Sequence, residues 1–297
     1  YIILNTLFLD GNIMIGVSPA YFFSRFTTDF SVDQYAMGLP LLKEIGFGAY
    51  QLEIYDAARI DEWRAGALGL AAAAKNCGLI ESQFVAHFLM ERTRSIDALS
   101  CDTGDDEVHK VVEIVQAFPS CKTVTIPVGP FIDQDSSKLQ GGQFDTAWAL
   151  LGERLTRWAS IIEAEGLRMA LEIVPSSLVA NTDGFMRLMD SISNTTIGYN
   201  FDTGHAWSSR EPITLIPSKL RGRIYGTHLK DTPIGGGLAL VPGEGSIPWT
   251  SVLHELISAG YEGSLDLEIA CTSADEVEVA YRSGKQYVED VVMNITT

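Results

Sequence analysis

Four strand-like segments in the second half of the chain each end on a residue that could hold a metal ion. The segments are short and apolar, and a helix-like segment follows each, which is typical of the βαβ units of a parallel sheet. The carboxyl ends of parallel strands open on one side, so these residues are expected to meet there. Three carboxylates in one place would repel one another unless a cation neutralised them. The sequence therefore predicts a divalent metal site formed by Glu172, Asp202, His228 and Glu268.

The types of these residues indicate which metal would suit them. An oxygen-rich set with a single imidazole suits Mn²⁺, Mg²⁺ or Co²⁺ and also tolerates Zn²⁺. Glu172 in RMALEIV and Glu268 in SLDLEIA lie between apolar residues, where an unpartnered carboxylate is costly to bury. An ion pair with Arg or Lys is the alternative for either glutamate alone. The recurrence of Asp202 and His228 at equivalent strand ends favours metal ligation.

Five further side chains are candidates for contacting a substrate. His205, expected in the loop after its strand, is predicted to bind substrate, with a second metal or a structural role as alternatives. Lys230 could meet a substrate oxygen or pair with a neighbouring carboxylate. His87, near the end of the third strand, and Glu53, near the end of the second, could line the same mouth or serve in packing. Trp207 could wall the pocket.

The elements that must position these residues alternate regularly along the chain. Strands are expected over 13–18, 49–55, 79–88, 122–128, 168–174, 196–202, 223–229 and 264–270. Helices are expected over 31–46, 61–77, 107–118, 144–165, 183–193, 212–220, 253–259 and 275–292. Eight alternations without a linker predict one α/β domain over residues 1–297, a single (β/α)8 TIM barrel in which residues 1–12 are an N-terminal extension.

Two other observations bear on this architecture. A doubly wound open sheet is the alternative fold, but no GxGxxG motif opens a helix after the first strand. The long polar segment 129–143 follows the fourth strand, and a loop of that length in a compact domain is more often functional than idle.

Composition limits the environment and the partners. The chain has 297 residues, 46% of them hydrophobic, which is ample for one large core, and its formal net charge is −17. Such a charge repels phosphate backbones, so no nucleic acid partner is expected. The four scattered cysteines indicate reduced thiols in a cytoplasmic protein. The apolar opening segment is short and lacks a basic flank, so neither a signal peptide nor a membrane span is expected. Assembly into a homo-oligomer is left open.

At the predicted metal site, the sequence resembles the xylose isomerase-like barrel superfamily of sugar (phosphate) isomerases and epimerases, which also contains the endonuclease IV group. The matching motifs are LEI at Glu172, NFDTGH at Asp202 and His205, THLKD at His228, the following PGEGSIPW, and DLEIA at Glu268. Their order is specific in the C-terminal half, whereas the N-terminal half agrees mainly in its βα rhythm. The resemblance implies a (β/α)8 fold and one divalent ion held by Glu172, Asp202, His228 and Glu268.

The sequence departs from parts of this superfamily. Members of the endonuclease IV group need further histidines for a trinuclear zinc cluster, but no His follows the fourth strand and no Asp-x-His pair follows THLKD. Sugar 3-epimerases usually carry another Glu after the Glu172 position and an Arg after the His228 position, where this chain reads VPSSLVANT and TPIGGGLAL. Dehydratases of cyclic polyols and of dehydroshikimate suit the HLKD segment equally.

These observations predict an enzyme that abstracts a proton beside a carbonyl of a small polyhydroxy substrate. Isomerisation or epimerisation through an enediolate is the expected reaction, with Glu172 and Glu268 sharing the acid and base roles and His205 steadying a substrate oxygen. The same intermediate could expel a β-hydroxyl, so a metal-dependent dehydratase (a lyase) of the inosose or dehydroshikimate type is the alternative. A non-catalytic metal-binding barrel and an abasic-site endonuclease are less favoured.

Overall fold

Eight parallel strands form the centre of the molecule. The computed structural model describes residues 8–9, 12–27, 29–132 and 143–296. The strands are β3 (Ile15–Val17), β4 (Ala49–Ile54), β5 (Ile80–Ala86), β6 (Thr123–Val128), β7 (Arg168–Ile173), β8 (Gly198–Asp202), β9 (Ile224–His228) and β10 (Leu265–Leu267). Each pairs with its neighbour in chain order, and β10 returns to β3. This order confirms the predicted (β/α)8 barrel.

The ring is completed between β9 and β10. Leu229 and Leu267 form one parallel bridge there. The amide of Leu229 donates to the carbonyl of Asp266, and the amide of Glu268 donates to the carbonyl of Leu229. The last strand is therefore pinned at its carboxyl end, where the chemically interesting side chains were predicted to meet.

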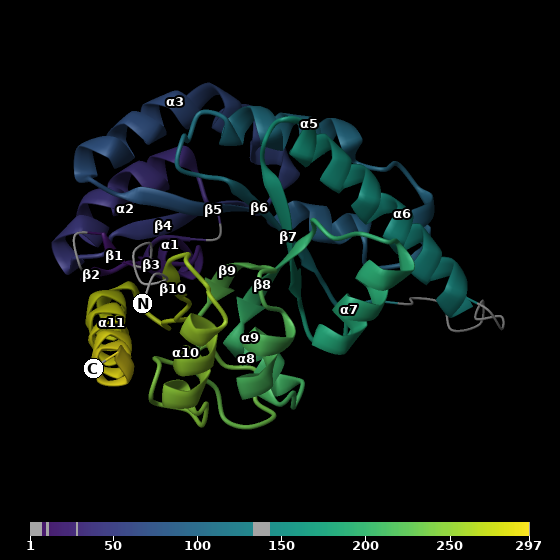
Figure 1. Cartoon of the computed structure of the whole chain (residues 1–297). Coiled ribbons are helices and arrows are strands. Elements are labelled where there is room, and N and C mark those ends of the chain that lie inside the picture. Colours follow the sequence, from purple (N-terminus) through teal and green to yellow (C-terminus); the bar gives the residue numbers. More distant parts are fainter. Residues whose placement is uncertain (1–7, 10–11, 28, 133–142, 297) are drawn as a thin grey trace.

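Helices surround the strands on the outside of the barrel (Figure 1). They are α1 (Ala20–Arg25), α2 (Val32–Ile45), α3 (Ile60–Cys77), α4 (Ile96–Ser100), α5 (Asp105–Val115), α6 (Gln143–Ala164), α7 (Thr182–Ser191), α8 (Thr203–Ser208), α9 (Ile216–Lys219), α10 (Trp249–Ser258) and α11 (Ala274–Thr296). Short 3-10 helices add η1 (Ala57–Arg59), η2 (His87–Arg92) and η4 (Ile213–Leu215). The final helix, α11, packs against α10 and against α1 and α2.

Local signals explain several helix ends. The hydroxyl of Ser31 accepts from the amide of Gln34 at the start of α2, and Gly46 ends that helix with φ of 91°, a conformation that suits glycine. Asn181 caps α7 in the same way by accepting from the amide of Gly184. Each side chain satisfies an amide that a helix terminus leaves without an intrahelical partner.

Several predicted boundaries are corrected by the structure. The short helices α1, α4 and α8 were not predicted, because segments of five or six residues carry too little periodic signal. The predicted helix over 212–220 is divided into η4 and α9, and α10 begins at Trp249 instead of at 253. The third strand ends at Ala86, so His87 is the first residue of η2 and not part of the strand.

The core has an apolar layer between strands and helices and a polar layer inside the barrel. Large aromatic side chains such as Trp63, Trp158, Phe84 and Phe201 are fully buried. Inside the ring, amide and hydroxyl side chains from different strands hydrogen-bond to one another beneath the carboxyl ends. The floor of the barrel mouth is therefore fixed by directional contacts, which position side chains more sharply than apolar packing does.

The remaining features concern the N-terminus, the long loop and the cysteines. Phe8–Leu9 (β1) pairs antiparallel with Asn12–Ile13 (β2) outside the barrel sheet. The assignment of residues 1–12 to an extension of one domain stays a prediction. Most of the long polar loop, residues 133–142, lies outside the described residues. All four cysteines are free, as expected. Among the described residues, no helix has the length and apolar character needed to cross a membrane.

Candidate metal centre and active site

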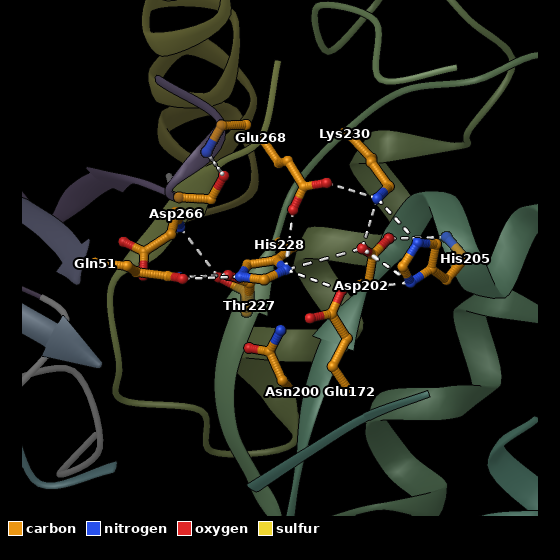
Figure 2. A network of polar contacts seen from close by, with 12 residues as sticks. Gln51, Glu172, Asn200, Asp202, His205, Thr227, His228, Lys230, Asp266 and Glu268 are labelled. Atoms are coloured by element: carbon orange, nitrogen blue, oxygen red, sulfur yellow. Dashed lines mark hydrogen bonds and ion pairs between the residues drawn. The ribbon is translucent and has the colours of Figure 1, made fainter. Parts of the chain in front are cut away.

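Four side chains from consecutive barrel strands converge at the mouth (Figure 2). Glu172 comes from β7, Asp202 from β8, His228 from β9, and Glu268 directly follows β10. One donor atom of each lies within 4.8 Å of the other three. Donors on opposite sides of one ion lie about 4–5 Å apart, since metal–oxygen bonds are about 2.0–2.5 Å long. The spacing therefore fits a single divalent cation.

The imidazole of His228 is the centre of this cluster. Its Nδ1 lies 2.9 Å from Glu268 Oε2 and 3.2 Å from Glu172 Oε1. Its Nε2 points the other way and lies 2.8 Å from Gln51 Oε1. Burial lowers the pKa of His228, but the adjoining Glu172 and Glu268 outweigh burial and raise it well above its usual value. Such crowding of carboxylates around Nδ1 requires a proton or a cation at that atom.

The carboxylates have different electrostatic environments. Burial raises the pKa of Glu172, but His228 and His205 outweigh it and hold the pKa at about 2. Burial likewise acts on Glu268, where Lys230 and His228 lower the pKa well below its usual value. Both groups are therefore ionised at neutral pH. Their negative charge is compensated by neighbouring cationic groups, and a divalent ion would add to that compensation.

Lys230 is the buried cation of the cluster. Its Nζ lies 2.7 Å from Asp202 Oδ2, 2.6 Å from Glu268 Oε1 and 3.2 Å from His205 Nε2. Burial lowers the pKa of Lys230, but Asp202 and Glu268 outweigh burial and raise it. Its stem lies against Gly204, where an added Cβ would be 2.6 Å from the Lys230 Cε. Of the two roles considered for Lys230, the structure places it in the ion pair.

His205 lies in helix α8, not in a loop as predicted. The helix begins here because Asp202 Oδ1 accepts from the amide of His205 at 2.8 Å, which makes this aspartate a helix N-cap as well as a strand end. The ring is turned toward the cluster, with Nδ1 3.2 Å from Asp202 Oδ2 and 3.4 Å from Glu172 Oε1. His205 also lines the cavity described next.

A cavity of about 380 Å³ opens above the cluster. Among the described residues, its lining includes Glu172, His205, His228 and Glu268 but not Asp202, which is 2% exposed. The cavity therefore has the size of a small-molecule site, and two of the three carboxylates of the cluster face it.

Two further predicted residues line the walls of this cavity. Glu53 is buried, and burial followed by repulsion from Glu172 raises its pKa well above the usual value. The ring of His87 stacks on Tyr55 with centroids 4.3 Å apart, and burial lowers the pKa of His87. A neutral carboxyl group and a neutral imidazole are therefore expected at the wall.

Trp207 lies elsewhere. Its indole Nε1 donates to Ser246 Oγ at 2.9 Å, and the described residues that line the cavity do not include it. The residue sits in α8, and this hydrogen bond joins the helix to the segment that follows Asp231. It is not brought to the cavity that contains the other candidates.

Two polar residues near the site were not singled out from the sequence. Gln51 and Asp266 lie two positions before Glu53 and Glu268 on the inward face of their strands, and Gln51 contacts His228. A polar residue two positions before a candidate residue is the signal that could have identified them. Asp231, which ends the THLKD motif, belongs to a loop and is described separately.

The carboxylate of Asp231 collects four hydrogen bonds, which we call the Asp231 hub. It accepts from the backbone amides of Thr232, Gly243 and Ile247 and, at 2.7 Å, from the indole of Trp249. Asp231 also pairs with Leu240 in an antiparallel bridge. The hub fastens the long segment after β9 directly beside Lys230.

A comparison with protein families identifies the family to which this fold belongs. The family described as xylose isomerase-like TIM barrel matches residues 39–291. The match covers most of the chain, and the protein therefore belongs to the xylose isomerase-like TIM barrel family. The resemblance found in the sequence motifs is confirmed.

The chain is also similar to curated relatives over part of its length. The inosose dehydratase of Salmonella typhimurium is 27% identical over 168 residues, which cover 50% of this chain and 56% of the relative. The fructoselysine 3-epimerase of Escherichia coli O157:H7 is 24% identical over 132 residues, which cover 43% of this chain and 48% of the relative. The matched part therefore spans about half the length of these relatives.

Two solved structures share the fold over nearly the whole chain. The xylose isomerase domain protein from Alicyclobacillus acidocaldarius has a TM-score of 0.72 and 17% identity, covering 95% of this chain and 99% of the other. The IOLI protein with a binding zinc atom has a TM-score of 0.71 and 17% identity, with coverage of 95% and 99%. At these identities the likeness concerns the barrel alone.

Proposed function

We propose that the protein is a divalent-metal-dependent enzyme that transfers a proton beside the carbonyl of a small polyhydroxylated substrate. Glu172, Asp202, His228 and Glu268 would hold the ion, and the zinc atom bound by the IOLI protein supports metal binding in a barrel of this fold. When bound, the ion would act as a Lewis acid that stabilises negative charge on substrate oxygens. Mn²⁺, Mg²⁺, Co²⁺ and Zn²⁺ all suit the donor set.

The observation that carries the proposal is that Glu172 and Glu268 face the cavity while Asp202 does not. Both glutamates are ionised, so either can remove a proton from a carbon next to the carbonyl. Because they come from different strands, one can take a proton while the other returns it to a different atom or face. Isomerisation or epimerisation through an enediolate follows from this arrangement.

The surrounding residues would bind and orient the substrate. His205 reaches the cavity and would steady a substrate oxygen, and the ammonium of Lys230, directly behind it, favours negative charge there. His87 and Tyr55 present a stacked wall for the substrate carbons. We retain Trp207 as a predicted contact only for a ligand that extends beyond the described cavity.

Dehydration is the second candidate, and Glu53 favours it. Loss of a β-hydroxyl needs a proton donor for the leaving oxygen in addition to a base. Glu53 lines the cavity, and its raised pKa favours the protonated form, which a general acid requires. The likeness to inosose dehydratases supports the same reaction.

Incubation in D₂O distinguishes the two reactions. Metal-loaded protein would be incubated with candidate ketoses, inososes and dehydroshikimate, and the recovered compounds analysed by NMR and ultraviolet absorbance. Deuterium at the α-carbon of recovered or epimerised substrate supports isomerisation or epimerisation, and a new enone or aromatic absorbance supports dehydration. If the protein binds the metal ion but gives neither deuterium incorporation nor a new absorbance with any metal, a non-catalytic barrel is favoured. Cleavage of abasic-site DNA would instead indicate a nuclease.

A further inference from the structure

Gln51 lies in the barrel interior directly behind the candidate metal centre (Figure 2). Its side chain is fully buried on β4. The amide oxygen is 2.8 Å from His228 Nε2, and the amide nitrogen is 2.8 Å from Asp266 Oδ2 and 3.2 Å from the backbone carbonyl of Thr227. Gln51 therefore connects the imidazole of the cluster to two acceptors below it.

The partners determine which way the Gln51 amide points. The carbonyl of Thr227 can only accept a hydrogen bond, so the end of the amide next to it must be the NH₂ group. This holds whatever the protonation state of Asp266. The other end is then the amide oxygen, which can only accept, and its partner is His228 Nε2. That nitrogen must therefore carry a proton.

The position of this proton decides which nitrogen of His228 is free to bind a cation. A neutral imidazole protonated at Nε2 has its lone pair at Nδ1. The Nδ1 atom is the one that faces Glu172 and Glu268. We propose that Gln51 is a positioning residue, which holds His228 in the Nε2–H form and so presents Nδ1 to a divalent cation. The inference rests on the metal site of the proposed function.

The surrounding barrel fixes Gln51 in turn. Asp266 Oδ2 also accepts from Ser82 Oγ at 2.8 Å, so this carboxyl group is held from two strands. Gly16 leaves room for the carboxyl group of Asp266, because a Cβ at position 16 would lie 2.1 Å from Asp266 Oδ1. Side chains behind a metal ligand that are held in this way fix its ring orientation and its tautomer.

A pair of matched variants tests the role of Gln51. The Kd for Zn²⁺ would be measured by competition with a chelator for the parent, for Gln51→Leu and for Gln83→Leu. Gln83 is also a buried glutamine, on the adjacent strand, but it bonds to Asn200 and Thr125 and not to His228. We expect Gln51→Leu to raise the Kd about ten- to a hundredfold, because it removes a contact that orients a metal ligand. Gln83→Leu removes no such contact, so its Kd should stay within about threefold of the parent value.

Nitrogen NMR of histidine reports the ring directly. In the Zn²⁺-loaded parent labelled with ¹⁵N-histidine, we expect His228 to show a metal-bound Nδ1 and a slowly exchanging proton at Nε2. In Gln51→Leu the Nε2 proton should exchange rapidly.

Each outcome has a distinct meaning. A parent-like Kd and ring spectrum for Gln51→Leu overturns the role of Gln51 while leaving the proposed function intact. Equal loss in Gln83→Leu also overturns it, because general damage to the barrel interior would then explain the loss. A parent chain that binds no Zn²⁺ removes the metal site itself, and with it the proposed function.

Discussion

Replacing Lys230 by methionine removes the only positive charge that the described residues place against both Asp202 and Glu268 at under 3 Å, while keeping a stem of similar length. In the metal-free protein the two carboxylates then lose their shared partner. Removing one member of a buried ion pair costs about 3–5 kcal/mol, because an uncompensated charge remains buried. At about 2 °C per kcal/mol, the metal-free Lys230→Met protein should melt about 6–10 °C below the parent.

The same substitution should strengthen metal binding. A cation held by these carboxylates is repelled by the Lys230 ammonium. Two unit charges about 5 Å apart at an effective dielectric constant of about 20 repel by about 3 kcal/mol, and a divalent ion doubles this to about 6 kcal/mol. Even if solvent and structural relaxation remove most of that energy, the Kd for the ion should fall at least about tenfold, which corresponds to about 1.4 kcal/mol.

Differential scanning calorimetry with and without Zn²⁺ measures both effects together. A ligand that binds only the folded state raises its melting temperature according to the ratio of ligand concentration to Kd. The increase on adding Zn²⁺ should therefore be larger for Lys230→Met than for the parent. Lys219→Met is the matched control, because Lys219 pairs with Asp183 at the surface, and an exposed pair contributes about 0–1 kcal/mol. Equal Zn²⁺ increments in parent and Lys230→Met would refute the reasoning.

Three further predictions concern the cavity. Glu268→Gln at saturating metal should lower kcat about 10²- to 10⁴-fold, measured on whichever substrate the D₂O experiment identifies; full activity would exclude its acid–base role. The raised pKa of Glu53 stabilises the fold below about pH 4.3, and this contribution is lost as the pH rises. Raising the pH from 4 to 8 should therefore lower the free energy of unfolding, measured by chemical denaturation, more for the parent than for Glu53→Gln. The lowered pKa of His87 stabilises the fold above about pH 6.5 and loses that contribution on acidification, so His87→Phe should lose less stability than the parent between pH 7 and 5.

The barrel could be predicted because its strands are buried on both faces and separated by helices of regular period. Residues such as Glu172 and Glu268 stand out in apolar strands, since a charge there is costly without a partner. Parallel pairing then brings strand ends together whatever the loops do. The convergence of these side chains therefore depends only on the order and direction of the strands, which the alternation of strands and helices in the sequence predicts.

Other features depend on contacts between distant parts of the chain. The helix that contains His205 begins because Asp202, already at the end of a strand, also caps it, and a six-residue helix has no periodic signature of its own. Gln51 and Asp266 are separated by 215 positions in the sequence. Their pairing requires strand register in three dimensions, which no local pattern of residues specifies.

The Asp231 hub divides the segment after β9 into an anchored part and a replaceable part. Residues 233–239 lie between the paired positions Asp231 and Leu240, and Ile234 and Leu238 within them are exposed. Ala239, at the end of this stretch, lines the cavity. Ala239 itself is held, because its carbonyl accepts from the amide of Ala270. Exchanges of the exposed side chains Ile234 and Leu238 can therefore alter the rim of the mouth without loosening the residues beside Lys230. The side chains at the rim of the barrel can therefore differ between relatives while the cluster of Glu172, Asp202, His228 and Glu268 keeps its geometry.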